Sequence, residues 1–148
     1  MSISAQSFEQ GRVNVRLQIS ALWIAMLFLF AYGDIFGFFK PGELDQIANG
    51  EVSGIEITQT FLLAVSVYIA IASAMVFLTL VLPRAGARWA NLVLPVLYIV
   101  SIVASAIGES WLYFWFLSVA EIVALLAIVW LAWRWPRGEP VRPGPSPS

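Results

Sequence analysis

Four apolar segments of membrane-spanning length constrain the fold of this chain more than any other feature. They cover residues 17–36, 61–82, 91–107 and 111–133. A helix that crosses a bilayer needs roughly 20 predominantly apolar residues, within a range of about 17–25. Because backbone polar groups cannot stay unpaired in lipid, each segment must be helical. The sequence therefore predicts an all-α, integral membrane four-helix bundle.

The composition agrees with a chain that lies mostly in lipid. Of its 148 residues, 60% are hydrophobic and 11% are charged, whereas a soluble domain has about 45–50% apolar and about 25% charged residues. Cysteine and histidine are both absent, which excludes disulfides, thiolate chemistry, imidazole metal ligands and the commonest general base. We therefore expect no enzymatic activity, no metal site and no cofactor.

Basic residues are concentrated in both tails and in the connection between the second and third segments. These are Arg12, Arg16, Arg84, Arg88, Arg134, Arg137 and Arg142. Only Lys40 falls on the other side of a four-span bundle. The positive-inside rule then predicts that both termini are cytoplasmic, an N-in/C-in topology in the cell membrane.

The chain divides into three predicted parts. Residues 1–14 form a cytoplasmic N-terminal tail, residues 15–136 the four-transmembrane-helix domain, and residues 137–148 a disordered, proline-rich cytoplasmic tail. Between helices 1 and 2 a Pro-Gly turn, the helix-like ELDQIA and an Asn-Gly turn predict a small ordered extracytoplasmic loop. Thr58 is the predicted N-cap of the second helix.

One carboxylate, Glu121, lies in the middle of the last apolar segment. At about 1.5 Å per helical residue it lies about 15 Å below Trp111, close to the bilayer midplane. An ionised carboxylate there is costly and usually faces the bundle interior or a water-filled cavity. None of the four segments contains Lys or Arg to neutralise it. We predict a largely protonated Glu121 that donates a hydrogen bond to a serine, a tyrosine or a backbone carbonyl.

Several hydroxyl groups share the depth of this acid and complete a predicted intramembrane polar site. Ser118 lies one turn above Glu121 on the same helix, Ser101 and Tyr98 lie on the third segment, and Ser73 lies on the second. Two further acids, Asp34 and Glu109, lie at the outer ends of the first and third segments. Those two are expected to be interfacial residues at the outer mouth of the bundle.

Three roles for Glu121 remain open at this stage. It could join helices through a hydrogen bond, which is typically worth about 0.6 kcal/mol in a membrane protein. It could be a proton or cation site in a transport path, or part of a ligand site. We expect a non-catalytic, multi-pass protein that packs with itself or a membrane partner, or binds a lipophilic ligand. The alternative is a proton-linked small-solute transporter or channel using Glu121. The lipid bilayer is an expected partner; nucleic acid is not.

Four stretches of the sequence also resemble those of a known family. They are LWIAMLFLFAYGDIF, KPGELDQIANGEVSGIEIT, LPRAGARWANL and AEIVALLAIVWLAWRWP. They resemble a bacterial four-span membrane family described only as a domain of unknown function, number 6326, over residues 15–136. The third segment is more hydroxyl-rich than that resemblance predicts. The likeness implies a multi-pass membrane protein and supplies no activity, substrate or site residues.

Overall fold

The structure, a computed structural model, describes residues 13–135 and consists of four long helices with a small structured connection. The long helices are α1 (Val15–Gly37), α3 (Gln59–Val81), α4 (Arg84–Ser105) and α5 (Leu112–Trp133). Each is long and apolar enough to cross a membrane, so the predicted helical fold with four such segments is confirmed. The predicted tail 137–148 and residues 1–12 of the predicted N-terminal tail lie outside the described residues.

The start of α4 differs from the prediction. The sequence predicts a helix that begins at Asn91, but α4 begins at Arg84, with Pro83 as its N-cap residue. Proline has a fixed φ that suits a helix start, and the alanines that follow favour the helical state. Asn91 therefore lies about two turns inside the helix rather than at its end. The predicted cap of α3 is confirmed, since Thr58 Oγ1 accepts a hydrogen bond from the Phe61 N–H at 3.1 Å.

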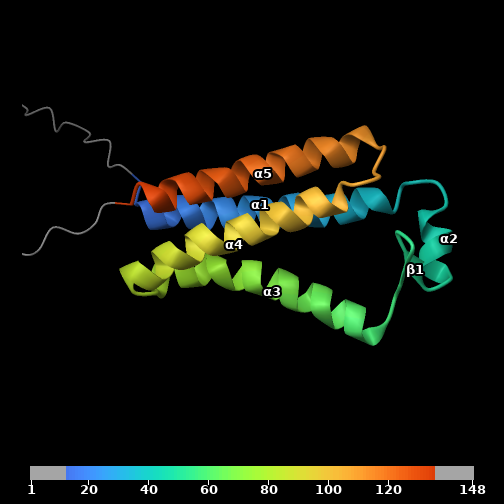
Figure 1. The fold of residues 1–148 in the computed structure, drawn as a ribbon, viewed down its shortest axis with the longest axis horizontal. Coiled ribbons are helices and arrows are strands. Elements are labelled where there is room, and N and C mark those ends of the chain that lie inside the picture. The colour runs from blue at the N-terminus through green and yellow to red at the C-terminus, as the bar shows by residue number, and fades with distance from the viewer. Residues whose placement is uncertain (1–12, 136–148) are drawn as a thin grey trace, which may run out of the picture.

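The connection between α1 and α3 holds the short helix α2 (Glu43–Ala48) and a hairpin of β1 (Glu51–Val52) and β2 (Ile55–Glu56). The hairpin turns at Ser53 and Gly54, whose φ angles are 48° and 75°. Two successive positive φ values are typical of the two-residue turns that match strand twist. In Figure 1 this connection lies across the end of the bundle that is distant from the start of α1 and the end of α5.

The helices pack unequally. Helix α1 packs extensively on α3 and α5, and α4 packs on α5, but α3 and α4 touch only sparsely. Two glycines of α1 lie beside side chains of α5: a methyl group at Gly33 would lie 3.7 Å from Leu117 Cδ1, and one at Gly37 would lie 3.9 Å from Tyr113 Oη. Both distances are ordinary van der Waals contacts, and they show that the distal part of α1 lies alongside the first turns of α5.

A buried polar cluster joins three helices in the half of the bundle that holds the start of α1 and the end of α5, which we call the proximal half. Asn91 on α4 is fully buried and accepts a hydrogen bond from Trp23 Nε1 on α1 at 2.7 Å. Its amide nitrogen donates to Thr79 Oγ1 on α3 at 3.1 Å and to the Ala87 carbonyl at 2.8 Å. Ser20 adds a bond from α1 to the Val76 carbonyl of α3 at 2.9 Å. The proximal half is therefore closed.

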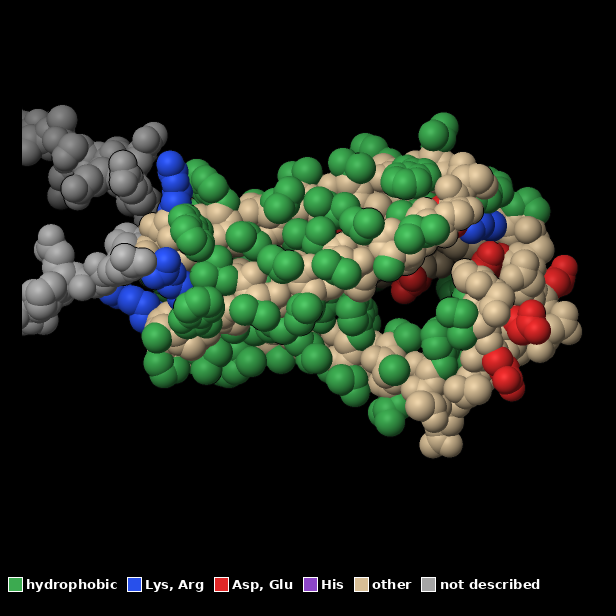
Figure 2. Space-filling view, in the orientation of Figure 1, with side chains coloured by type: hydrophobic (Ala, Val, Ile, Leu, Met, Phe, Trp, Pro, Cys, Tyr) green, Lys and Arg blue, Asp and Glu red, His purple; other side chains and the backbone are tan. Residues whose placement is uncertain are grey.

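The other half, which we call distal, is open on one side. Figure 1 shows α3 diverging from the other helices toward its first residues, next to α2 and β1. Figure 2 shows hydrophobic side chains over the flank of the molecule and an opening between the diverging segments, with an acidic side chain at its rim. The four arginines of residues 13–135 lie at the proximal end and most of the acids at the distal end (Figure 2).

Hydrogen bonds from Arg16 connect the start of α1 to the end of α3, and removal of this side chain is expected to destabilise the bundle. Its Nη1 donates to the carbonyls of Leu80 at 2.7 Å and Leu82 at 2.9 Å, which no helical N–H can reach. Hydrogen bonds to charged groups contribute about 1.5–3 kcal/mol. We expect Arg16→Ala to lower the free energy of unfolding in detergent by about 1–3 kcal/mol.

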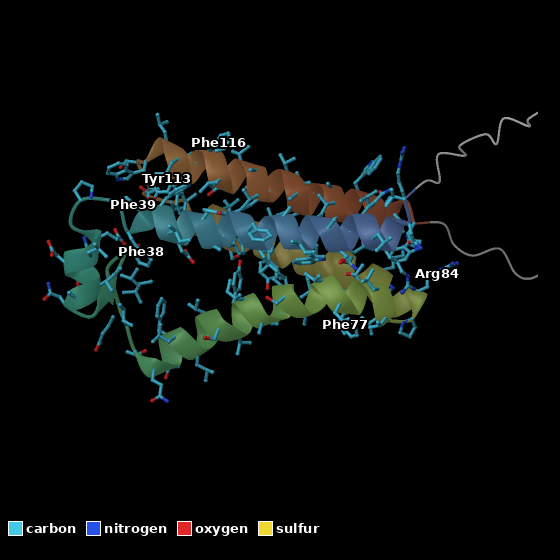
Figure 3. The ribbon with its side chains drawn as sticks, turned by 180° about the vertical axis from the view of Figure 1, so that it is seen from behind. Phe38, Phe39, Phe77, Arg84, Tyr113 and Phe116 are labelled. Atoms are coloured by element: carbon cyan, nitrogen blue, oxygen red, sulfur yellow. The ribbon has the colours of Figure 1, made fainter. Side chains whose placement is uncertain are left out.

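Arg84 supplies the matched control for that substitution. It is exposed at the same end of the molecule (Figure 3), and it donates no hydrogen bond to a described residue. Arg84→Ala removes the same charge and should leave the unfolding curve nearly unchanged. Equal destabilisation by both substitutions would mean that net charge, and not the capping of α3, is responsible.

Candidate functional site in the distal half

A cavity of about 650 Å³ lies between the distal halves of the four long helices, under the α1–α3 connection. We call it the distal cavity. Its size falls in the range of about 300–1,000 Å³ that is usual for small-molecule sites. Apolar and aromatic side chains make most of its wall, and Val52 and Ser53 of the hairpin close one side. The polar residues that line it within the long helices are Asp34, Tyr68, Ser101, Ser105, Tyr113, Ser118 and Glu121.

Glu121 faces this cavity from α5. Only 6% of the residue is exposed, and it lines the inner part of the space. Within residues 13–135 no hydrogen bond reaches its carboxyl group, and the hydroxyls of Tyr98 and Ser101 donate instead to the carbonyls of Tyr68 and Tyr98. The expected hydrogen bond from Glu121 to a serine, a tyrosine or a carbonyl is thus not present. Ser118, 5% exposed, lines the same cavity one turn above.

Aromatic rings form the floor of the cavity. Tyr68 on α3 stacks against Phe30 on α1 with ring centroids 6.0 Å apart, and both rings line the cavity. The Tyr68 hydroxyl lies 2.6 Å from Ser101 Oγ. Tyr98, 3% exposed, packs beneath with its ring centroid 4.4 Å from that of Tyr68, and its hydroxyl donates to the Tyr68 carbonyl. Tyr98 therefore packs against Tyr68, which lines the cavity, and is not itself part of the lining.

Ser73 is not part of the site, which corrects the prediction for this residue. It is exposed on α3 and does not line the cavity. Helix α3 turns Tyr68, Ile69 and Val65 toward the cavity, and buries Ala72, Met75 and Thr79 further along. Depth along the helix was predicted from residue number, but the face that a residue occupies depends on how its helix is rotated in the bundle.

The two predicted mouth acids both line the distal cavity, in different surroundings. Glu109 accepts hydrogen bonds from Lys40 Nζ at 3.0 Å and from the N–H groups of Ser110 at 2.9 Å and Trp111 at 3.1 Å. Asp34, by contrast, is exposed on α1 and forms no ion pair with a described residue. Figure 3 shows Tyr113 at this end of the bundle, with Phe38 and Phe39 of the connection nearby.

The pKa of Glu109 is lowered by its partners. Burial by itself raises the pKa of this carboxyl, but the hydrogen bonds from Lys40 and from the Trp111 and Ser110 N–H groups outweigh it. A carboxyl whose pKa is lower in the folded state stabilises the fold above its unfolded pKa. That stabilisation is lost as the pH falls through the folded pKa. At neutral pH the contact between Glu109 and Lys40 should therefore keep the α4–α5 connection in place. In acid, where Glu109 is protonated, this contact should be lost.

We expect Glu109→Gln to lower the thermal unfolding midpoint at pH 7, and the difference from the unsubstituted protein to shrink as the pH falls below about 4. The expected loss at pH 7 is about 1 kcal/mol or less, because the ion pair is partly exposed. Glu56→Gln, at an exposed position of the hairpin, is the control. A difference between the Glu109 variant and the unsubstituted protein that stays constant from pH 7 to pH 3 would contradict this assignment.

The side chains that line the cavity are mostly apolar, with a few polar groups among them. Among residues 13–135 no three acidic side chains lie close enough together to hold a metal ion. The polar groups of the lining are carboxyls and hydroxyls set in an aromatic and aliphatic wall. Such a lining, with few polar groups in a mostly apolar space, is typical of sites that bind organic molecules.

Three residues form side-chain hydrogen bonds between separate segments of the chain that the sequence does not predict. Tyr68, Asn91 and Lys40 bond respectively to Ser101, Trp23 and Glu109. Trp23 offered a clue, because it lies well inside its apolar segment, and a buried indole N–H usually has a hydrogen-bond partner. The partner itself could not be deduced, since Asn91 appeared to lie at a helix end.

Comparison with known proteins gives one match. The model of a family described as "Family of unknown function (DUF6326)" matches residues 6–141. No curated protein and no solved structure matches the chain.

Proposed function

We propose that this chain, which belongs to the DUF6326 family of unknown function, is a membrane protein that binds a lipophilic small molecule in its distal cavity. The observation that supports this most is the cavity itself, about 650 Å³ between helices that are in contact at their proximal ends. A bundle that served only as a packing unit would gain van der Waals contact by closing that space. The proposal is for binding and not for catalysis.

The sparse contact between α3 and α4 supports an entry route for such a ligand. A lipophilic molecule is concentrated in the bilayer, and the opening in Figure 2 faces the flank of the bundle. The flank exposes large apolar side chains, including Phe77 and Phe116, which extend away from the bundle in Figure 3. A ligand could therefore pass from the membrane to the cavity between α3 and α4 without crossing water.

The proposal also assigns each end of the bundle to one side of the membrane. The arginines at the proximal end, Arg16, Arg84, Arg88 and Arg134, favour the cytoplasmic side for that end. Both chain ends would then be cytoplasmic, and the distal cavity would open on the opposite face of a bacterial inner membrane. Association with a second copy or with a membrane partner is compatible with this arrangement and forms no part of the binding proposal.

A tryptophan placed in the cavity tests the proposal. Val65 lines the cavity from α3 and is 43% exposed, so Val65→Trp should fill the space without disturbing the buried core. We expect it to weaken binding of the neutral fluorophore N-phenylnaphthylamine to nanodisc-embedded protein at least about tenfold, equivalent to 1.4 kcal/mol. Leu63, two residues away and 63% exposed, does not line the cavity, so Leu63→Trp is the matched control.

The result is read against nanodiscs that contain no protein, because the fluorophore also enters lipid. Saturable binding that Val65→Trp weakens and Leu63→Trp leaves intact supports the proposal. Fluorescence that never exceeds that of the protein-free discs, or that both tryptophan variants reduce equally, would refute it.

A second candidate function, proton-linked transport of a small solute, is favoured by one observation. Glu121 lies in the inner part of a cavity that opens toward the distal end, where a titrating site in a transport path would be expected. In proteoliposomes with a pH gradient, Glu121→Gln should then abolish flux of the solute while the protein remains folded. Flux that is unaffected by this substitution excludes the candidate.

A further inference from the structure

We infer that the distal cavity takes amphipathic organic cations, namely amines whose ammonium group favours the ionised form of Glu121 and pairs with it, while an apolar body fills the aromatic-walled space. The inference rests on the proposed binding function and adds the chemical class of the ligand. Its starting point is Glu121 itself, an acidic residue of which only 6% is exposed. This carboxyl faces a cavity and has no hydrogen-bond partner among the described residues.

The charges that line the cavity are strongly unbalanced. Four acids line it, Asp34, Glu43, Glu109 and Glu121, against one base, Lys40. Lys40 is already engaged, because its Nζ lies 3.0 Å from Glu109 and 4.0 Å from Glu43. Asp34 and Glu121 are left without a basic partner in residues 13–135. A cavity of one charge sign between low-dielectric walls concentrates counter-ions, so a cationic ligand is favoured and an anionic lipid or metabolite is disfavoured.

The two free acids lie at different depths in the cavity. Gly33 lies beside the Leu117 side chain and Gly37 beside the Tyr113 hydroxyl, so Asp34 lies next to the part of α5 that is roughly one turn distal to Glu121. One helical turn is about 5.4 Å, so Glu121 is deeper than Asp34 by roughly that distance. Within the cavity, Asp34 is therefore the acid nearer the distal mouth and Glu121 is the acid at the bottom. This arrangement suits a ligand with one ammonium group at Glu121 and an elongated apolar body.

The wall of the cavity suits the rest of such a ligand. Phe30 and Tyr68 form its floor at about the level of Glu121, and Phe61, Phe114 and Tyr113 also line it. Aromatic faces attract organic cations, by about 0.5–1 kcal/mol at exposed sites and about 2 kcal/mol or more where water is excluded. An inorganic cation would gain little from these rings. It would also find no cluster of three acidic ligands in the described part of the chain.

The experiment compares two probes of the same shape. Phenylbutylamine is a cation at pH 7, and phenylbutanol is its uncharged counterpart. Binding of each to the full-length protein is measured by equilibrium dialysis in nanodiscs of zwitterionic phosphatidylcholine, so that the lipid itself does not attract the amine. We expect the protein to bind the amine at least about tenfold more tightly than the alcohol.

Two substitutions at Glu121 test the pairing directly. Glu121→Gln keeps the shape and removes the charge, and should reduce amine affinity to the level of the alcohol while alcohol binding stays unchanged. The unchanged alcohol binding also shows that the variant is folded. Glu121→Asp keeps the charge and should keep most of the preference for the amine. Asp34→Asn should reduce the preference less than Glu121→Gln, because Asp34 is the more exposed acid.

The binding results that would contradict the inference differ from those that would contradict the proposed function. Equal affinity for amine and alcohol, with both abolished by Val65→Trp, would overturn the cation inference and leave the proposed binding function intact. A preference for the amine that survives Glu121→Gln would also overturn it. Absence of binding of either probe, above that of protein-free discs, would overturn the binding function together with the inference.

Discussion

Replacing Asn91 with leucine is expected to lower the free energy of unfolding by about 1–3 kcal/mol, because it leaves a buried donor without a partner. The Trp23 indole N–H donates to Asn91 Oδ1 at 2.7 Å, and both residues are fully buried. Leucine fills a similar volume and cannot accept that bond. It also removes the bond to Thr79, so the polar link between α1, α3 and α4 is lost. Thermal unfolding in a mild detergent, followed by circular dichroism, measures the effect.

A double-mutant cycle separates the polar link from simple changes of packing. Trp23→Phe in the Asn91→Leu background removes the unpaired N–H, so the double variant should be destabilised by clearly less than the sum of the two single variants. Additive effects would show that the two side chains are not coupled. In that case the closed proximal half would depend on apolar packing alone.

A cysteine placed at Ser118 is expected to react with a small, membrane-impermeant thiol reagent at least about tenfold faster than one placed at Ser20, because thiol reactivity follows access to water and thiolate formation. The two serines are equally buried, each 5% exposed, which makes them a matched pair. Ser118 lines the distal cavity, whereas Ser20 lies in the closed proximal half and donates to the Val76 carbonyl. The chain has no cysteine of its own, so labelling is specific to the introduced thiol.

The same pair of variants tests which side of the membrane the distal end faces. If the distal end is extracytoplasmic, Ser118→Cys should be labelled when the reagent is added outside intact cells and protected by prior addition of phenylbutylamine. Comparable labelling of Ser118→Cys and Ser20→Cys would indicate that no water path leads from the distal end to the cavity. Labelling of Ser118→Cys only in inverted membrane vesicles would reverse the proposed orientation.

Much of the candidate site could be predicted because position along a helix gives depth in the bilayer. Glu121, Ser118 and Ser101 were grouped from depth alone and line one cavity, together with Asp34 and Glu109 from the mouth. Ser73 and Tyr98 failed to join them for a different reason. Their depth was right, but Ser73 is on an exposed face and Tyr98 is buried beneath Tyr68. Helix rotation depends on neighbours that belong to other helices.

The sequence by itself determined the four membrane-length helices, because lipid requires every backbone polar group to be paired within its own segment. It also determined the asymmetry between an arginine-rich end and an acidic end. Only the tertiary structure decided that the bundle closes around Asn91 at one end and diverges at the other. Glu121 faces the resulting cavity and not a hydroxyl partner. The physical reason is that contacts between helices in lipid depend on which faces meet and how closely, and side chains far apart in the chain set both.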